Sequence, residues 1–215
     1  MKALLVIDVQ NDFVPPNGSL AVEHGEEVIQ PIIKLMNDEN NVYKWDKIVL
    51  TRDWHPTNHI SFAKSHELPN FSPFVYDSPI PGDDSKQDGI LWPIHCVQDT
   101  EGGQLVDDLV REVDKHHYTI VNKGCLTDRE YYSAFNDIWN YHKTELNDLL
   151  KEQGIDEVYV VGLALDFCVK NTAISAAKLG YKTTILKAYT RAINTDAESM
   201  QRLNDELVAN KVAFS

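Results

Sequence analysis

One cysteine lies where it could act as a nucleophile. Cys168 follows an apolar, β-rich run, Val158–Leu163, across a short loop, and a segment with helical periodicity comes after it. This pattern predicts a strand-to-helix turn with Cys168 on the first turn of the helix, where free backbone N–H groups and the helix dipole favour an anion. We therefore expect a lowered thiol pKa and a reactive sulfur. Taken alone, Cys168 also fits a small buried residue that packs a helix against a sheet.

Ionisable side chains follow three other apolar runs. Asp8 comes at the end of the first run, Asp53 at the end of the second and Lys123 at the end of the third. The carboxyl ends of parallel strands share one edge of a sheet, and ligands of open α/β sheets bind at that edge. Any one of these residues fits a polar group satisfied at a strand end. Four reactive or ionisable groups at four strand ends indicate a functional site.

Asp8, Lys123 and Cys168 are the residue types that a cysteine hydrolase needs. The thiol requires a base and the leaving group requires an acid, and one carboxyl group can serve as both in turn. A neighbouring lysine lowers the thiol pKa and balances the charge of the buried carboxylate. The chain has no Cys-His protease signature. This set favours acyl transfer on an amide.

A second group of residues has the composition of a metal site. Asp53 and His55 are separated by one residue just after a strand, and His95 lies at the far end of a long irregular loop. A carboxylate and two imidazoles that leave positions open suit zinc or another borderline divalent metal. His59 is either a fourth ligand, a neighbour of the ligands or an exposed side chain.

The segments that must position these residues alternate between strand and helix. This alternation predicts an α/β protein with a mainly parallel sheet and helices on both faces. The expected strands are Lys2–Val9, Lys47–Asp53, His117–Gly124, Glu157–Ala164, Lys182–Tyr189 and Val212–Phe214. The expected helices are Gly25–Asn37, Gly103–Lys115, Lys143–Gln153, the segment from Cys168 to a C-terminal Gly180, and Asp196–Asn210.

Two stretches interrupt the alternation. Trp54–Gly102 has almost no regular pattern, and an irregular connection of that length in a compact domain is usually functional. Leu126–His142 is rich in aromatic residues, which fits a short helix and loop over a cavity, an oligomer contact or satellite core packing. Because no linker divides the chain, we expect residues 1–215 to form a single domain.

Composition narrows the classes of partner. The chain has 215 residues, a net charge of −13 and three cysteines, without a CxxC pair. The negative charge argues against nucleic acid and anionic membranes. No apolar stretch is long enough to span a bilayer, and the N-terminus begins directly with a strand. Sparse cysteines indicate a reduced, intracellular protein, which we expect to be cytoplasmic. Access to the nucleus or the peroxisome stays open, and so does a homo-oligomeric state.

Several sequence motifs resemble those of a known family. They are IDVQNDF (7–13), RDWHP (52–56), GILWPIHC (89–96), KG followed by SAF (123–124 and 133–135) and GLALDFCVKNTAISAAKLGY (162–181). In this order they resemble the isochorismatase-like cysteine hydrolases and, within that group, the fungal nicotinamidases. The resemblance runs from Met1 to about Tyr189.

The resemblance implies a fold and an activity. The fold is a Rossmann-like three-layer α/β/α sandwich with a six-stranded, mainly parallel sheet of strand order 3-2-1-4-5-6. The activity is hydrolysis of nicotinamide to nicotinate and ammonia through a cysteine thioester, as a step of NAD salvage. A zinc ion holds the pyridine nitrogen in that mechanism, and another divalent metal is the alternative.

The resemblance also assigns roles to individual residues, with no expected catalytic or metal residue missing. It implies a catalytic triad of Asp8, Lys123 and Cys168, an oxyanion hole formed by the N–H groups of Ala164 and Cys168, and a metal site at Asp53, His55 and His95. Phe13, Trp92 and Phe167 match positions that wall the ring. A cis peptide bond is implied between Leu163 and Ala164.

Two other functions compete with this interpretation. One is a different amidase or isochorismatase-type hydrolase on the same fold, which the complete metal set disfavours because many such relatives lack the metal. The other is a non-catalytic small-molecule or metal-binding protein, or a redox protein that uses Cys168. The intact set of Asp8, Lys123 and Cys168 disfavours this second alternative.

Overall fold

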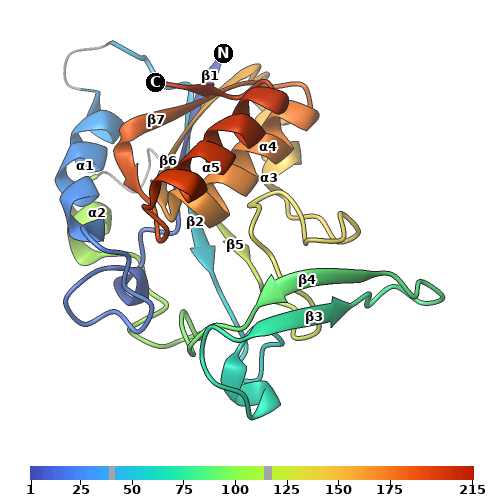
Figure 1. The fold of residues 1–215 in the computed structure, drawn as a ribbon. Coiled ribbons are helices and arrows are strands. Elements are labelled where there is room, and N and C mark those ends of the chain that lie inside the picture. The colour runs from blue at the N-terminus through green and yellow to red at the C-terminus, as the bar shows by residue number, and fades with distance from the viewer. Residues whose placement is uncertain (39–41, 114–117) are drawn as a thin grey trace.

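A six-stranded parallel sheet forms the centre of the molecule (Figure 1). The computed structural model describes residues 1–38, 42–113 and 118–215. The strands are β1 (Lys2–Ile7), β2 (Lys47–Asp53), β5 (Tyr118–Lys123), β6 (Glu157–Leu163), β7 (Lys182–Arg191) and β8 (Ala213–Phe214). They lie in the order β5-β2-β1-β6-β7-β8. Counted along the chain, this is the order 3-2-1-4-5-6, so the expected topology is confirmed.

Helices cover both faces of the sheet, which confirms the three-layer α/β/α architecture. α1 (Ile29–Asn37) and α2 (Asp107–Glu112) lie on one face. α3 (Leu146–Glu152), α4 (Lys170–Lys178) and α5 (Ala197–Ala209) lie on the other (Figure 1). Successive side chains of β1 point to opposite faces, so Leu5 and Ile7 join the core beneath α4 and α5 while Leu4 and Val6 join the core beneath α1. Burial on both faces explains why the strands read as continuous apolar runs.

The helix boundaries agree in part with the sequence. The expected helix Gly25–Asn37 begins with a 3-10 turn, Gly25–Val28, before α1. Gly180 follows α4 with a φ of +97°, as expected for a glycine that ends a helix. α2 is shorter than predicted, because its backbone is already extended at Val113. The helix end at Lys115, the strand start at His117 and the connector residues 39–41 lie outside the described residues.

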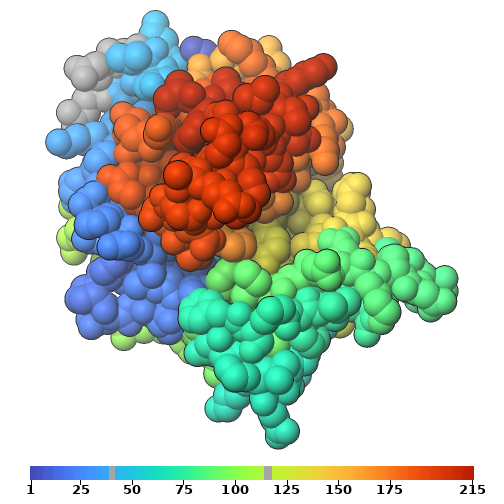
Figure 2. Space-filling view, in the orientation of Figure 1, coloured from blue at the N-terminus to red at the C-terminus, as the bar shows by residue number. Residues whose placement is uncertain are grey.

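The long stretch after β2 contains a hairpin that the sequence pattern did not predict. β3 (Pro73–Asp77) and β4 (Lys86–Ile90) pair in antiparallel fashion and project from the body as an arm (Figures 1 and 2). A short 3-10 turn, Ala63–His66, precedes them. β3 has only five residues, of which Tyr76 alone is buried, and β4 contains three polar residues and a glycine, so β3 is too short and β4 too polar to be recognised as a strand from its pattern. The expectation of an irregular connection is therefore wrong for this part.

The aromatic stretch Leu126–His142 contains no helix, so the alternative of a short helix with a loop is not the one observed. The buried carboxylate of Asp137 accepts hydrogen bonds from the N–H groups of Tyr141 and His142 at 2.8 and 3.1 Å, and this side-chain bonding replaces a helical ladder. Tyr131 is buried, as is Phe135, which belongs to the core cluster beneath α4. The stretch therefore contributes to packing around the sheet edge.

The described helices are short. The longest, α5, has 13 residues. Among the residues that the structure describes, no helix has both the length and the apolar character needed to cross a membrane.

Candidate active site

The structure brings the four predicted strand-end residues together at the carboxyl edge of the sheet. Asp8 directly follows β1, and Asp53 and Lys123 are the last residues of β2 and β5. Asp53 and Lys123 are also register partners in these neighbouring parallel strands, so their side chains emerge side by side. Cys168 reaches the same point from the turn that follows β6.

Lys123 lies at the centre of this group. Its ammonium nitrogen Nζ is 3.0 Å from Asp8 Oδ2 and 3.3 Å from Cys168 Sγ, and it donates a hydrogen bond to Asp53 Oδ1. The lysine is only 1% exposed. Burial lowers the pKa of Lys123, but the two carboxylates outweigh burial and raise it well above its usual value. A positive charge fixed here allows two carboxylates to share a buried site.

Asp8 is held by the neighbouring strand. Thr51, a buried residue of β2, donates from Oγ1 to Asp8 Oδ1 at 2.6 Å and accepts the Asp8 N–H at 3.2 Å. An oxygen of Asp8 and the sulfur of Cys168 lie within 4.8 Å of each other. Burial raises the pKa of Asp8 above its usual value. A carboxylate with a raised pKa is a stronger base, so Asp8 is suited to accept the thiol proton.

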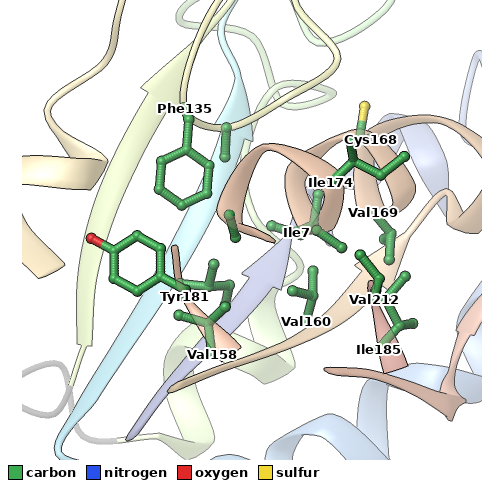
Figure 3. Close-up of a cluster of buried hydrophobic side chains, with 14 of the residues drawn as sticks. Ile7, Phe135, Val158, Val160, Cys168, Val169, Ile174, Tyr181, Ile185 and Val212 are labelled. Carbon is green, nitrogen blue, oxygen red and sulfur yellow. The ribbon is translucent and has the colours of Figure 1, made fainter. Parts of the chain in front are cut away.

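Cys168 sits in a wide turn between β6 and α4. The peptide bond between Leu163 and Ala164 is cis, as the resemblance implied. The turn that follows, Leu165–Val169, is π-helical, so Cys168 precedes the α-helix and does not lie on its first turn. The Ala164 carbonyl accepts hydrogen bonds from Phe167 and Val169, the residues on either side of Cys168 (3.1 Å each). Figure 3 shows the sulfur pointing away from the apolar side chains beneath it.

The expected lowering of the Cys168 pKa is wrong. Burial raises the pKa of this thiol well above its usual value, Lys123 lowers it, and the charges of Asp8 and Asp53 raise it further. The sequence showed the helix start and the lysine, but it did not show how completely the sulfur is buried or that two carboxylates face it. The resting sulfur is therefore a thiol that must lose its proton to a neighbouring base before it can attack.

Asp53, His55 and His95 form the second cluster. Asp53 Oδ2 lies 3.6 Å from His55 Nε2 and 3.9 Å from His95 Nε2. The Nδ1 atoms lie 2.9 Å from the Gly124 carbonyl and 2.7 Å from the Pro93 carbonyl, respectively. Because a carbonyl only accepts, each Nδ1 carries a hydrogen, and the Nε2 atoms, which face Asp53, are the atoms that could bind a metal ion. Histidine ligands are usually fixed in this way, so the donor set fits a divalent metal such as zinc.

The electrostatics of this cluster suit the same role. Burial raises the pKa of Asp53, but Lys123 and His55 outweigh it and hold the pKa well below its usual value. Burial, together with His55, lowers the pKa of His95 to about 4. Asp53 is therefore an anion and His95 a neutral imidazole at pH 7, which are the forms that bind metals. Burial lowers the pKa of His55, but Asp53 outweighs burial and raises it, so a metal ion competes with a proton for this ring.

His59 packs against the cluster. Its ring centroid lies 4.1 Å from that of His55, and its Nδ1 lies 2.7 Å from Ser61 Oγ. The side chain is fully buried, so the interpretation as an exposed residue is wrong. Its Nε2 has no hydrogen-bond partner among the described residues, and it lies outside the group whose donor atoms converge.

Three residues near the site were not identified from the sequence. Glu130 is buried beside the cluster, and burial raises its pKa to about 7. Thr51 binds Asp8, and Gln10 binds the backbone of Asp53. No local pattern marks these residues, although Gln10 lies within the IDVQNDF motif. Glu130 lies in the aromatic stretch, which the sequence singled out only as a unit.

A narrow cavity joins the two clusters. Its volume is about 30 Å³. The three residues expected to wall a ring, Phe13, Trp92 and Phe167, all line it. Its other lining residues are Leu20, Asp53, His95, Glu130, Tyr131, Tyr132, Ala164, Cys168 and Ile193. A larger groove of about 680 Å³, beside the hairpin, contains none of the predicted site residues.

Comparison with known proteins adds an independent line of evidence. Residues 2–209 match the isochorismatase domain family. The nicotinamidase of Saccharomyces cerevisiae is 57% identical over 213 residues, which cover 99% of this chain and 98% of the yeast protein. The crystal structure of yeast nicotinamidase Pnc1p bound to the inhibitor nicotinaldehyde superposes with a TM-score of 0.95 at 56% identity, covering 100% of this chain and 99% of that chain.

A more distant structure also matches along the whole chain. The pyrazinamidase of Pyrococcus horikoshii in complex with zinc superposes with a TM-score of 0.75 at 30% identity. The match covers 100% of this chain and 98% of that chain.

Proposed function

The chain belongs to the isochorismatase family, and from this premise we propose that it is a nicotinamidase, a single-domain amidohydrolase of residues 1–215. The reaction is hydrolysis of nicotinamide to nicotinate and ammonia. One observation carries the proposal: a single cavity is lined both by a cysteine that contacts a buried lysine and by two members of an Asp-His-His donor set. The full-length similarity to yeast nicotinamidase supports it.

The cavity walls suit an aromatic ring that carries a carboxamide. Phe13, Trp92 and Phe167 provide apolar faces, and Phe167 lies edge-on to Trp92 with the ring centroids 4.9 Å apart. Asp53, His55 and His95 would hold the zinc or another divalent ion. When bound, that ion supplies a Lewis-acidic template for the ring nitrogen of the substrate. Cys168 lines the same cavity, so the carboxamide of a ring held there can reach the sulfur.

The first half of the reaction forms a thioester. Asp8 accepts the proton of the Cys168 thiol, and the sulfur attacks the carboxamide carbon as the carbonyl electrons move to oxygen. The backbone N–H groups of Ala164 and Cys168 stabilise that oxyanion. When the intermediate collapses, the C–N bond breaks and Asp8 returns its proton to the departing ammonia. Lys123 keeps its positive charge and stabilises the thiolate and the Asp8 carboxylate in turn.

The second half releases the acid. Asp8 removes a proton from a water molecule, whose oxygen attacks the thioester carbon and forms a second oxyanion in the same backbone site. The C–S bond then breaks, the acid leaves and loses its proton to solvent to become nicotinate, and the Cys168 sulfur recovers its proton from Asp8. Each carboxyl and thiol group ends in its starting form, so the cycle is closed.

The setting of the reaction follows from its product. Nicotinate is a precursor of pyridine nucleotides, so we place the enzyme in NAD salvage. A cytoplasmic location is proposed on the basis of three free cysteines, of which Cys125 is exposed and would be oxidised in a disulfide-forming compartment.

A comparison of two amides tests the function. Purified zinc-loaded protein is incubated with nicotinamide or with benzamide, which has the same carboxamide but no ring nitrogen, and the acid product is quantified by chromatography. We expect nicotinate to form with a kcat/KM at least about 100-fold higher than that for benzamide, because only nicotinamide offers a ring donor to the metal site. Absence of nicotinate formation would rule out the proposed activity and point to another amide as the substrate.

A further inference from the structure

Gln10 binds the backbone of the central metal-site residue through its side-chain amide. Its Oε1 accepts the Asp53 N–H at 2.8 Å, and its Nε2 donates to the Asp53 carbonyl at 2.8 Å. The same Nε2 donates to the Gly103 carbonyl, also at 2.8 Å. Gln10 is completely buried, so water cannot replace these bonds. All three polar contacts of the amide are therefore made with main-chain groups.

The Gln10 amide bonds to β2 at a point where β2 no longer pairs with β1. The pairing between β1 and β2 ends at Val6 and Leu50, and β1 itself ends at Ile7, whereas β2 continues to Asp53. On its other side, β2 remains paired with β5 as far as Asp53 and Lys123. The Gln10 amide thus makes the two hydrogen bonds to the Asp53 main chain that a residue of a paired strand would otherwise make.

The Asp53 backbone has to be fixed because the Asp53 side chain interacts with a lysine and two histidines at once. Its Oδ1 accepts from Lys123, and its Oδ2 faces the Nε2 atoms of His55 and His95. A metal ligand must keep its position within a few tenths of an ångström of the favoured distance. Without Gln10, a buried N–H and two buried carbonyls would lose their partners, and the end of β2 would shift to satisfy them.

We propose that Gln10 is a positioning residue that sets the metal affinity of the Asp53-His55-His95 site by fixing the backbone of Asp53. The inference rests on the proposed metal site. Gln10 makes no contact with Cys168 among the hydrogen bonds of the described residues, so its effect passes through Asp53. Partners of metal ligands typically change metal affinity by 10- to 100-fold when they are removed.

The test is the metal affinity of a Gln10→Met variant, which keeps the side-chain length but removes every hydrogen bond. The zinc dissociation constant is measured by competition with a chromophoric chelator, and the visible absorption spectrum of the cobalt(II)-loaded protein reports the ligand geometry. We expect zinc to bind 10- to 100-fold more weakly than in the wild type, with a changed cobalt spectrum. Gln10→Asn, which keeps the amide on a side chain one methylene shorter, provides a second variant if Gln10→Met does not fold.

Gln87→Met is the matched control. Gln87 donates from its Nε2 to the Ile138 carbonyl at 2.9 Å on the β4 side of the molecule, so its loss removes a similar bond away from the metal cluster. We expect Gln87→Met to keep wild-type zinc affinity and an unchanged cobalt spectrum, even where its thermal stability falls. Wild-type zinc affinity and an unchanged cobalt spectrum in a folded Gln10 variant would overturn the inference. If the wild type itself bound no zinc, the proposed metal site would fail as well, and the two failures are thereby distinguished.

Discussion

Lys123 carries the charge that allows two carboxylates and a thiol to share one buried point. It pairs with both Asp8 and Asp53 and contacts Cys168. The same lysine therefore links the proposed nucleophile to the carboxylate of the proposed metal site. Burial raises the pKa values of both Asp8 and Cys168, so neither group is strongly acidic. A proton can therefore move between these two neighbours.

Replacing the nucleophile tests the residue roles directly. We expect Cys168→Ala to abolish nicotinamide hydrolysis while zinc content, measured by mass spectrometry, and nicotinate binding, measured by calorimetry, persist. The sulfur is not a member of the Asp53-His55-His95 set, so its removal leaves those donors in place. Cys125→Ala, which removes an exposed cysteine, is the control and should retain full activity. Turnover by Cys168→Ala at a rate close to that of the control would show that another residue is the nucleophile.

The buried carboxyl group of Glu130 predicts a pH-dependent stability difference. Its pKa is raised from 4.5 to about 7 by burial, so the folded state holds this proton more tightly than the unfolded state does. The favourable contribution of the protonated group is complete below pH 4.5 and is lost as the pH rises through about 7. A shift of this size corresponds to about 3 kcal/mol.

Glu130→Gln should remove this dependence, because glutamine keeps the oxygen that accepts the Tyr131 N–H but cannot ionise. In metal-free protein we expect the variant to match the wild type near pH 4.5 and to exceed its unfolding free energy by about 3 kcal/mol above pH 7. Urea unfolding at several pH values measures the difference. A difference that stays constant with pH would contradict the assignment of a raised pKa.

At the scale of elements, the end of β6 shapes the turn that carries Cys168. Gly162 has a φ of +107°, and a Cβ there would lie 2.1 Å from the Ile7 carbonyl oxygen. The register between β6 and β7 also shifts between Val160 and Gly162. Only glycine combines this backbone conformation with so close an approach to β1. The position is therefore fixed by the meeting of three strands.

Two glycine substitutions distinguish the cost of a positive φ from the cost of a close contact with a neighbouring strand. Gly162 and Gly180 both have positive φ values, but nothing lies within 4 Å of a Cβ at Gly180. We expect Gly180→Ala to cost about 1 kcal/mol of unfolding free energy and Gly162→Ala about 3 kcal/mol or more. Thermal or urea unfolding of the two variants measures this difference. Equal losses would show that the close approach to Ile7 contributes nothing to stability.

Most of the sheet could be predicted, because buried parallel strands leave a direct trace in the sequence. Lys47–Asp53 and Glu157–Leu163 read as apolar runs and form β2 and β6. The hairpin β3–β4 leaves no such trace, since it packs few side chains and its strands are largely exposed. The conformation of Leu126–His142 could not be chosen from its sequence, because the Tyr141 and His142 N–H groups bond to the Asp137 side chain and no local pattern marks such a contact.

The residues of the candidate site that could be predicted are those with a reactive or ionisable side chain. Asp8, Lys123 and Cys168 stand at strand ends, where a reactive type is unusual. Thr51 and Gln10 act through bonds to residues 43 positions away in the chain, and no local pattern encodes such a contact. The pKa of Cys168 was misjudged for the same reason, because burial and the facing carboxylates are properties of the assembled fold.

At the scale of the whole molecule, the parallel topology gathers distant residues at one edge. β1 lies between β2 and β6, and β2 pairs with β5, so the residues that follow these strands converge although they span positions 8 to 168. The long connection between β2 and α2 then returns His95 to the same edge. The sulfur and two of the proposed metal donors therefore face one cavity, so we expect both to act on the same substrate molecule.

Ammonia release from nicotinamide tests this central claim most directly. Purified protein is assayed as prepared, after dialysis against a chelator, and after zinc is added back to the dialysed sample. We expect ammonia release from the protein as prepared, loss of release after dialysis against the chelator, and recovery of release after zinc is added back. Undiminished release from protein shown to be free of metal, or no release from zinc-loaded protein, would contradict this claim.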